Sequence, residues 1–282
     1  MQVIKSIEKM AAFSKKAITQ NKVLGFVPTM GYLHEGHLSL VKKAKKECDL
    51  VIISIFVNPA QFGPKEDLAA YPRDFRRDLK LLGPLKPDVV FKPDPSAVYP
   101  GDYHTYVQIE GGLTKKLCGS FRPAHFKGVT TIVAKLFNIV RPDKAYFGQK
   151  DAQQCVVIKK MVKDLNFPVE VIALPTVREK DGLALSSRNT YLTPEERKKA
   201  PVLYKTLRLA EKMILTGERN CAKVEQAMKK NLALVKGLEI QYAVVVDAGS
   251  LERKKIVSGN VLLALAVKLG ATRLIDNIIM EL

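Results

Sequence analysis

The sequence predicts an α/β fold built on a parallel sheet. Short, nearly continuous apolar runs at residues 50–57 and 169–174 are separated by segments whose apolar residues recur at helical spacing. Strands of this kind are buried on both faces, so the intervening helices must cover both sides of the sheet. The chain has 282 residues, a length that suggests about two domains.

The first part of the chain predicts a regular alternation of helices and strands. A helix is expected over 3–19, followed by a strand at 23–27 that Pro28 ends. A turn-rich segment at 29–37 leads into a helix from Gly36. Further helices are expected at about 73–82, 129–140 and 152–164, and further strands at 50–57, 88–91, 145–147 and 169–174. Such a sheet binds ligands at the carboxyl ends of its strands, where the order of connections reverses.

The pattern changes after residue 174. A loop is expected over 175–189, and Thr193-Pro194-Glu195-Glu196 is a helix start signal followed by helical spacing to about Leu215. Strands are expected near 240–246 and 261–267. We therefore expect two domains, residues 1–176 and residues 177–282.

Composition excludes several classes of protein. With 47% hydrophobic and 26% charged residues, the chain is globular, not disordered or collagen-like. Its longest apolar run is far shorter than the ~18 residues of a membrane span, and charges interrupt the N-terminus where a secretory signal needs an apolar core. Four scattered cysteines without a CxxC pair fit neither a zinc ribbon nor a disulfide scaffold. We therefore expect a cytoplasmic protein with no membrane partner.

The formal net charge of +18 keeps a nucleic-acid-binding protein as an alternative. Such a protein would bind with a steep dependence on salt. Much of the excess, however, lies in lysine runs at 42–46 and 198–199 that fit a solvated helix surface. We expect no nucleic-acid partner, because that class has no evident use for the motifs described next.

The first motif, Met30-Gly31-Tyr32-Leu33-His34-Glu35-Gly36-His37, lies between a strand and a helix. Two histidines three apart at a helix start share one face, where backbone N–H groups and the helix dipole favour an anion such as a phosphate. The glycines allow close approach of the backbone. The zinc protease signature requires a spacing of four, so a structural histidine pair is the main alternative.

Three further motifs also follow strands or precede helices. Asn58-Pro59-Ala60-Gln61 offers amides for a hydroxy acid, or a simple turn. In Gly148-Gln149-Lys150-Asp151-Ala152-Gln153-Gln154, Lys150 offers a charge to phosphate, unless Asp151 is a helix cap and the glutamines are solvated. Ser186-Ser187-Arg188 offers two hydroxyls and a guanidinium to phosphate oxygens, or belongs to an ordinary linker.

In this order the motifs resemble those of the pantothenate synthetases, ATP-dependent ligases that join pantoate to β-alanine and carry a His-x-Gly-His signature. The similarity extends through Tyr71-Pro72-Arg73, Arg122-Pro123-Ala124-His125-Phe126 and Thr272-Arg273-Leu274-Ile275-Asp276-Asn277, and so over nearly the whole chain. It implies a Rossmann-like doubly wound domain, a smaller α+β C-terminal domain that closes over ATP, and a homodimer. It also implies ATP as co-substrate, Mg²⁺ as cofactor, and pantoate and β-alanine as the other substrates.

The resemblance also implies roles for individual residues. His37 is expected to be the proton donor, and His34, Lys150, Ser187 and Arg188 are expected to stabilise phosphate charge. Gln61 and Gln154 are expected to hold pantoate, with Asn58 and Tyr71 in the same cleft. The residues expected at the ATP site are Met30, Gly31, Tyr32, Leu33, His34, Glu35, Gly36, His37, Gly148, Gln149, Lys150, Asp151, Val177, Leu185, Ser186, Ser187 and Arg188.

Two positions differ from the usual family pattern, and several residues allow alternative roles. The family often has Met where Leu185 stands, which conserves volume, and Gly or Thr at Ala124. The carboxylates Asp74, Asp78 and Asp151 are not separated as Mg²⁺ ligands. Residues 122–128 are either part of a cover over the site or a plain loop. The alternative activity is a nucleotidyltransferase that passes a nucleotide to a phosphorylated substrate without releasing AMP; it should lack the paired glutamines.

Overall fold

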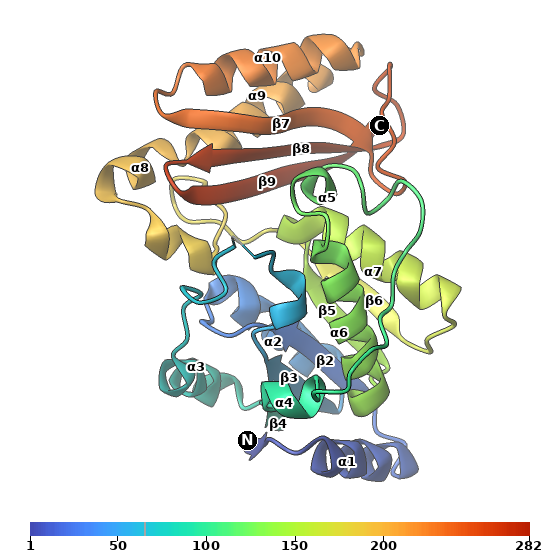
Figure 1. The fold of residues 1–282 in the computed structure, drawn as a ribbon. Helices are drawn as coiled ribbons and strands as arrows, with labels where there is room; N and C mark the ends of the chain where they lie inside the picture. The colour runs from blue at the N-terminus through green and yellow to red at the C-terminus, as the bar shows by residue number, and fades with distance from the viewer. Residues whose placement is uncertain (65) are drawn as a thin grey trace. The chain divides into compact units, whose positions relative to one another are not determined.

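The computed structural model describes residues 1–64 and 66–282, which form two compact units (Figure 1). Unit 1 comprises Met1–Lys115, Gly119–Gly148 and Val157–Pro175. Unit 2 comprises Lys116–Cys118, Gln149–Val156 and Thr176–Leu282. No helix in the described part of the chain is both long and apolar enough to cross a membrane.

Unit 1 contains a six-stranded parallel sheet in the order β1-β4-β3-β2-β5-β6. Its strands are β1 (Gln2–Ile4), β2 (Leu24–Thr29), β3 (Leu50–Ile55), β4 (Val89–Phe91), β5 (Lys144–Gly148) and β6 (Glu170–Leu174). Its helices are α1 (Ile7–Thr19), α2 (Glu35–Glu47), α3 (Phe75–Leu82), α4 (Pro95–Val98) and α6 (His125–Val140), with single 3₁₀ turns η1 (Pro59–Gln61) and η2 (Gly83–Leu85). Helices α5 (Cys118–Phe121) and α7 (Ala152–Asp164) belong partly to each unit.

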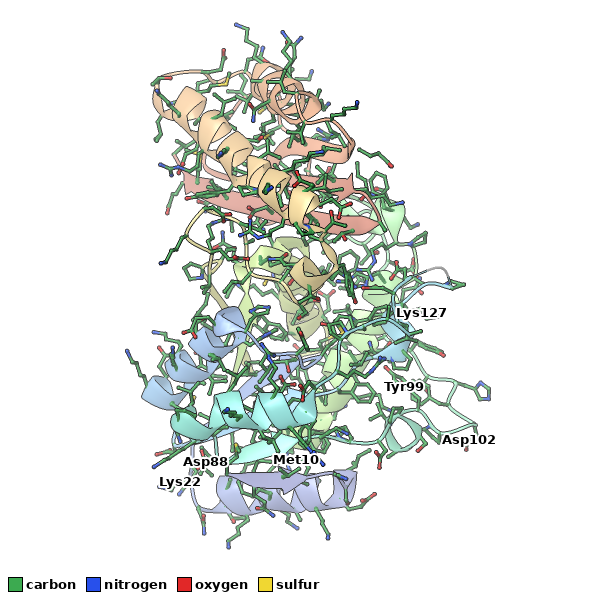
Figure 2. The ribbon with its side chains drawn as sticks, turned by 90° about the vertical axis from the view of Figure 1, so that its left-hand side faces the viewer. Met10, Lys22, Asp88, Tyr99, Asp102 and Lys127 are labelled. Carbon is green, nitrogen blue, oxygen red and sulfur yellow. The ribbon has the colours of Figure 1, made fainter. Side chains whose placement is uncertain are left out.

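Helices cover both faces of this sheet, as the apolar strands predicted. Phe26 and Val27 are adjacent in β2 and therefore point to opposite faces, yet both are fully buried. The Phe26 ring meets Phe137 of α6 edge to face, with ring centroids 6.5 Å apart. Val27 lies in a cluster with Val41 of α2 and Leu82 of α3. Met10 of α1, labelled in Figure 2, is also fully buried. The predicted doubly wound α/β class is confirmed.

The order of the strands reverses between β2 and β5. From β2 the chain adds β3 and β4 on one side, and then returns to add β5 and β6 on the other. Gly25 and Phe26 of β2 pair with Lys144 and Ala145 of β5. In open parallel sheets, ligands bind beyond the carboxyl ends of the strands at this reversal. The segment after β2, which carries the histidine motif, lies at that position.

Unit 2 contains a three-stranded antiparallel sheet in the order β7-β8-β9, confirming the smaller α+β part. Its strands are β7 (Leu238–Asp247), β8 (Asn260–Leu269) and β9 (Thr272–Glu281). Its helices are α8 (Pro194–Lys199), α9 (Val202–Leu215) and α10 (Cys221–Ala233), with 3₁₀ turns η3 (Gln149–Asp151) and η4 (Ser187–Tyr191). Buried side chains of α9 and α10, such as Leu207 and Val224, form one core with Leu263 of β8.

The helix predicted over 3–19 was wrong at its start. Residues Gln2–Ile4 form β1, which pairs with β4, and Ser6 ends the extended segment by capping α1. The Ser6 hydroxyl accepts a hydrogen bond from the Lys9 N–H at 3.2 Å, as an N-cap does. The apolar side chain of Ile4 fits a strand as well as a helix, so spacing alone did not separate them.

Later boundaries also needed correction. The single helical stretch predicted from 193 to 215 is two helices, because Pro201 has no N–H to donate to the preceding turn. The helix predicted from 129 begins at His125, so the second half of the 122–128 segment is helical. The loop predicted over 175–189 ends in the 3₁₀ turn η4. Helix α10 and strand β9 were not predicted.

Candidate active site

A strained turn connects β2 to α2 in unit 1. Gly31 has φ +83° and Tyr32 has φ 50°, both in the left-handed region. A Cβ on Gly31 would lie 2.9 Å from Ile55 Cγ2, so only glycine fits there without displacement. The carboxylate of Asp78 accepts from the backbone N–H groups of Tyr32 at 2.9 Å and Leu33 at 2.7 Å. Asp78, in α3, therefore holds the turn that carries the histidine motif.

Asp78 is 1% exposed, and burial is the largest influence on its pKa. Burial raises the pKa of Asp78 above its ordinary value, and the N–H groups of Leu33 and Tyr32 oppose that rise. Both carboxylate oxygens are already used by the turn. Asp78 therefore supports the turn.

The rings of His34 and His37 lie in contact, tilted by 33°, at the N-terminus of α2. His34 is the N-cap residue and His37 lies in the first turn, with ring centroids 4.1 Å apart. The His34 backbone N–H donates to Nδ1 of His37 at 3.3 Å. A neutral imidazole has one accepting and one donating nitrogen, so this bond leaves the hydrogen on Nε2 of His37. The helix terminus adds N–H groups and a positive dipole, and the arrangement is suited to an anion.

Asn58, the N-cap of η1, is buried with its carboxamide fully used. Its Nδ2 donates to Gln61 Oε1 at 3.0 Å and to Gly128 O at 3.0 Å. Its Oδ1 accepts from Ala60 N at 3.3 Å and from the hydroxyl of Tyr99, labelled in Figure 2, at 2.8 Å. An Asn side chain has two hydrogens and two acceptor positions, so the structure gives Asn58 the task of orienting Gln61.

Gln61 is the residue on which this network converges. Its Nε2 lies 3.2 Å from Sδ of Met30, which links the end of β2 to η1. Its backbone carbonyl accepts from His125 Nδ1 at 3.0 Å and from Arg122 at 3.3 Å. Both the side chain and the main chain of Gln61 are therefore held.

Arg122 is itself fixed by Glu66, whose Oε1 accepts from Arg122 Nε at 2.7 Å. Burial alone would raise the pKa of Glu66, but the Arg122 guanidinium more than offsets it, so this pKa lies below its ordinary value. The Arg122–His125 segment thus supports Gln61. The sequence offered it only as a cover or a loop.

Unit 2 holds the lysine motif in the turn η3, directly before α7. Lys150 Nζ lies 3.7 Å from Asp151 Oδ1, and the lysine side chain is partly exposed. Gln153 is buried and holds the segment Lys116–Cys118 by its carboxamide: Oε1 accepts from Cys118 N at 2.9 Å and Nε2 donates to Lys116 O at 2.8 Å. Gln154 follows on α7 and is half-buried. The alternative of two solvated glutamines is therefore wrong for Gln153.

The serine–arginine motif follows a small hairpin in unit 2. Leu185 N donates to Val177 O at 3.0 Å, and Glu179 N donates to Leu183 O at 2.8 Å. Gly182 closes the hairpin at φ +93°, where a Cβ would meet the Tyr204 ring at 2.3 Å. The Ser186 hydroxyl then caps η4 by accepting from the Arg188 N–H at 3.3 Å. Ser187 and Arg188 are consecutive residues of that turn.

The three carboxylates considered as Mg²⁺ ligands make different contacts. Asp74 caps α3 by accepting from Arg77 N at 2.9 Å, and Asp78 holds the β2–α2 turn. Among the described residues, no group of three or more His, Cys, Asp or Glu side chains forms a metal cluster. The Asp151 carboxylate lies in the same turn as Lys150, with its Oδ1 3.7 Å from Nζ.

The structure joins some predicted residues by direct contacts. Met30 and Asn58 each contact Gln61, and His34 contacts His37. Tyr71 is buried and its ring packs edge to face on Phe62 at 5.9 Å, which indicates a packing role. Sequence reasoning missed Tyr99 as a support of Asn58. Its only local signal was its place in an aromatic run with Tyr103 and Tyr106.

Comparisons with known proteins agree with the resemblance. The family model for pantoate-beta-alanine ligase matches residues 2–279. A pantothenate synthetase of Acetivibrio thermocellus is 55% identical over 281 residues, covering 100% of both chains. A pantothenate synthetase structure from Thermus thermophilus has a TM-score of 0.95 at 45% identity, covering 99% of each chain. A pantoate-beta-alanine ligase structure from Francisella tularensis, complexed with beta-gamma ATP and β-alanine, has a TM-score of 0.80 at 35% identity, covering 99% of this chain and 97% of that one.

These matches extend over both units. The histidine pair follows β2 at the strand reversal, the amide network follows β3, and the lysine turn follows β5. The chain belongs to the pantoate–β-alanine ligase family.

Proposed function

We propose that this chain is an ATP-dependent ligase that joins pantoate to β-alanine through a pantoyl adenylate, releasing AMP and pyrophosphate. The observation that carries the proposal is the His34–His37 pair at the N-terminus of α2, beside the reversal of strand order. The membership of the whole chain in the ligase family supports the same activity.

The reaction needs an activation step, because an amine does not displace oxide from a carboxylate near neutral pH. A pantoate carboxylate oxygen attacks the α-phosphorus of ATP, and the bond from that phosphorus to the bridging oxygen breaks. Pyrophosphate leaves with the electron pair. The amine of β-alanine then attacks the acyl carbon of the adenylate, AMP leaves, and the nitrogen loses a proton. Each atom is accounted for without a covalent intermediate on the protein.

His37 is proposed as a hydrogen-bond donor in the first step. Its Nε2–H would donate to the phosphate oxygen on which charge develops, while the N–H of His34 holds Nδ1. Because a neutral ring held in this way keeps its proton, hydrogen bonding replaces the proton transfer that the resemblance implies. Donors that are fixed before the reaction stabilise developing charge without reorganisation. His34, Lys150, Ser187 and Arg188 are proposed to stabilise the remaining phosphate charge.

Gln61 and Gln154 are proposed to bind pantoate, with Gln61 also near β-alanine. The support is the network that leaves Asn58 no spare donor and holds the main chain of Gln61 from His125. A fixed amide selects a hydroxy acid by hydrogen bonds without adding charge. In this proposal Asn58 orients Gln61 and does not touch substrate.

Mg²⁺ would neutralise phosphate charge, held by phosphate oxygens and one carboxylate, for which Asp151 is the candidate because Asp74 and Asp78 are committed to the backbone. The ATP site is proposed to include residues 30–37 in the domain 1–176 and Val177, Leu185 and Ser186 in the domain 177–282, which closes over ATP. A homodimer in the cytoplasm completes the proposal.

The test is to incubate the purified protein with ATP and Mg²⁺ and to quantify AMP, pyrophosphate and amide product. Pantoate with β-alanine should give the three products in equal amounts. Pantoate alone should give about one pyrophosphate per site and little free AMP, because the adenylate stays bound. Bound ATP with no AMP in any combination would overturn the proposal and favour a nucleotidyltransferase.

A further inference from the structure

Two consecutive residues of β9, Asp276 and Asn277, hold both ATP-site segments of unit 2. Their side chains are buried, at 2% and 4% exposure. They end the Thr272–Asn277 motif, to which neither the sequence nor the proposed reaction assigned a task. Polar side chains buried in a strand must be matched by partners, and here the partners are the lysine turn and the Arg178 hairpin.

Asn277 holds the backbone on both sides of Lys150. Its Nδ2 donates to Gln149 O at 3.0 Å and to Lys150 O at 2.9 Å. These carbonyls belong to the two peptide groups that flank the Cα of Lys150, so the pair of bonds restrains both dihedral angles there. The i→i+3 hydrogen bonds of a 3₁₀ turn have poorer geometry than those of an α-helix, and both hydrogens of the Asn277 carboxamide add bonds to this one.

Asp276 holds the hairpin that precedes Ser186–Arg188. Arg178 donates to it in a bidentate pair, from Nη1 to Oδ2 at 2.6 Å and from Nη2 to Oδ1 at 3.0 Å. The guanidinium also donates to Gly182 O at 3.1 Å and lies over the Tyr204 ring, 3.9 Å from its centroid. Arg178 follows Val177 and is bridged to Ala184, so its position sets the course of the hairpin.

Backbone hydrogen bonds also join Asp276, Asn277 and Arg178 to one another. Asp276 Oδ1 also accepts from the Asn277 N–H at 2.7 Å, and Arg178 Nη2 donates to Asn277 O at 3.3 Å. The lysine turn and the hairpin lie well apart in the sequence, but both are hydrogen-bonded to the Asp276–Asn277 dipeptide.

We infer that Asp276 and Asn277 are positioning residues for the ATP site, with Asn277 acting through Lys150 and Asp276 acting through Arg178. The inference rests on the proposed function, in which Lys150 stabilises phosphate charge. A displacement of about 1 Å in a group that contacts the reacting atoms can cost roughly 10²-fold in rate. Residues of β9 that hold Lys150 in place therefore affect the rate of the reaction.

The experiment compares Asn277→Asp with the matched control Asn231→Asp. Asn277→Asp keeps the shape but turns an oxygen toward the two carbonyls. Asn231 makes the corresponding single bond to Thr206 Oγ1 at 2.7 Å, between α9 and α10 of the same unit. Asn277→Asp should lower kcat/KM for ATP by roughly 10-fold or more and change the KM for β-alanine by less than about 3-fold. Asn231→Asp should leave both near the wild-type values.

A double-mutant cycle with Lys150→Ala separates positioning from general destabilisation. In the Lys150→Ala background, Asn277→Asp should have little further effect on kcat/KM for ATP, because the group that it positions is gone. Asn277→Ala gives a second variant if the added carboxylate beside Asp276 prevents folding. Full additivity of the two losses overturns the inference while pantothenate formation by the wild type stands. Absence of pantothenate from the wild type overturns the proposed function itself.

Discussion

The backbone N–H of His34 donates to Nδ1 of His37 at 3.3 Å, and this bond leaves the hydrogen of a neutral His37 ring on Nε2. Because His34 is the N-cap and His37 lies in the first turn, the helix start itself positions the ring. The backbone therefore favours one tautomer of His37.

Replacing His37 with Asn and with Gln should separate these two ring nitrogens. Asn places its amide near Nδ1 and loses the Nε2 donor, whereas Gln can reach the position of Nε2. We expect His37→Asn to lose about 10²–10³ in the rate of adenylate formation, the usual loss for one such donor, and His37→Gln to retain more. Single-turnover release of pyrophosphate measures the rate. Equal rates for Asn, Gln and the wild type would exclude this role of the His37 Nε2–H group.

Tyr99→Phe should weaken pantoate binding without affecting ATP. The change leaves the buried Asn58 Oδ1 one hydrogen bond short, at a cost of about 1–2 kcal/mol, and frees the carboxamide that orients Gln61. The KM for pantoate should rise several-fold. Tyr103→Phe removes the hydroxyl from the neighbouring ring, 5.1 Å away, and serves as the control. A parallel change in the KM for ATP would point to a general loss of structure.

Gly128→Ala should disturb the same network from the other side. A Cβ at this position in α6 would lie 2.2 Å from Ala60 O and 2.5 Å from Gln61 N, so η1 must move. Overpacking of this kind costs about 1–3 kcal/mol, and kcat/KM for pantoate should fall at least 10-fold. Gly83→Ala is the control, since its Cβ would meet nothing within 4 Å. An unchanged pantoate KM in Gly128→Ala would show that Gln61 does not bind pantoate.

Asp276→Asn should be far more destabilising than the loss of an exposed ion pair. It leaves the Arg178 guanidinium largely buried without its counter-charge, which costs about 3–5 kcal/mol. Arg197→Ala removes more accessible, partly exposed pairs with Glu179 and Asp181 in the same unit and should cost about 0–1 kcal/mol. Urea unfolding followed by circular dichroism gives both values. If Asp276→Asn lowered the free energy of unfolding no more than the control does, the Arg178–Asp276 ion pair would not hold the hairpin.

Stability should fall in acid partly through Glu66. Its pKa is lowered in the folded state, because Arg122 offsets the effect of burial. Its contribution is therefore full above the unfolded pKa of about 4.3 and is lost as pH falls through the folded pKa. The free energy of unfolding of the wild type should exceed that of Glu66→Gln at pH 7, and the gap should narrow below about pH 4. Glu195→Gln, in an exposed pair with Lys198, is the control. A gap independent of pH would rule out this linkage.

Much of the fold of unit 1 could be predicted because its signals are local. The apolar runs of β2 and β3 are buried on both faces, and His34 and His37 share a helix start because they are three residues apart. The break at Pro201 was missed even though its signal is also local, since the helical spacing continues on both sides. Strand β1 was missed because its three residues form a strand only by pairing with β4.

The candidate site divides in the same way. Sequence motifs suggested Gln61, Lys150 and the serine–arginine turn, but not what holds them. Asn58 looked like a substrate ligand, yet its bonds to Gly128 and Tyr99 use its carboxamide completely. The sequence did not separate Asp78 from Asp74 and Asp151 as a Mg²⁺ ligand, whereas the structure shows that Asp78 holds the backbone of Tyr32 and Leu33.

The sequence by itself determined the alternation of strands and helices, the order of the motifs and the chemistry that their side chains offer, because these depend on residues within a few positions of one another. Only the tertiary structure decided which polar groups are available to bind substrate and which are already hydrogen-bonded within the protein. Asn277 reaches the carbonyl of Lys150 from 127 residues away. A side chain has few donors and acceptors, and only the fold brings distant backbone groups close enough to use them.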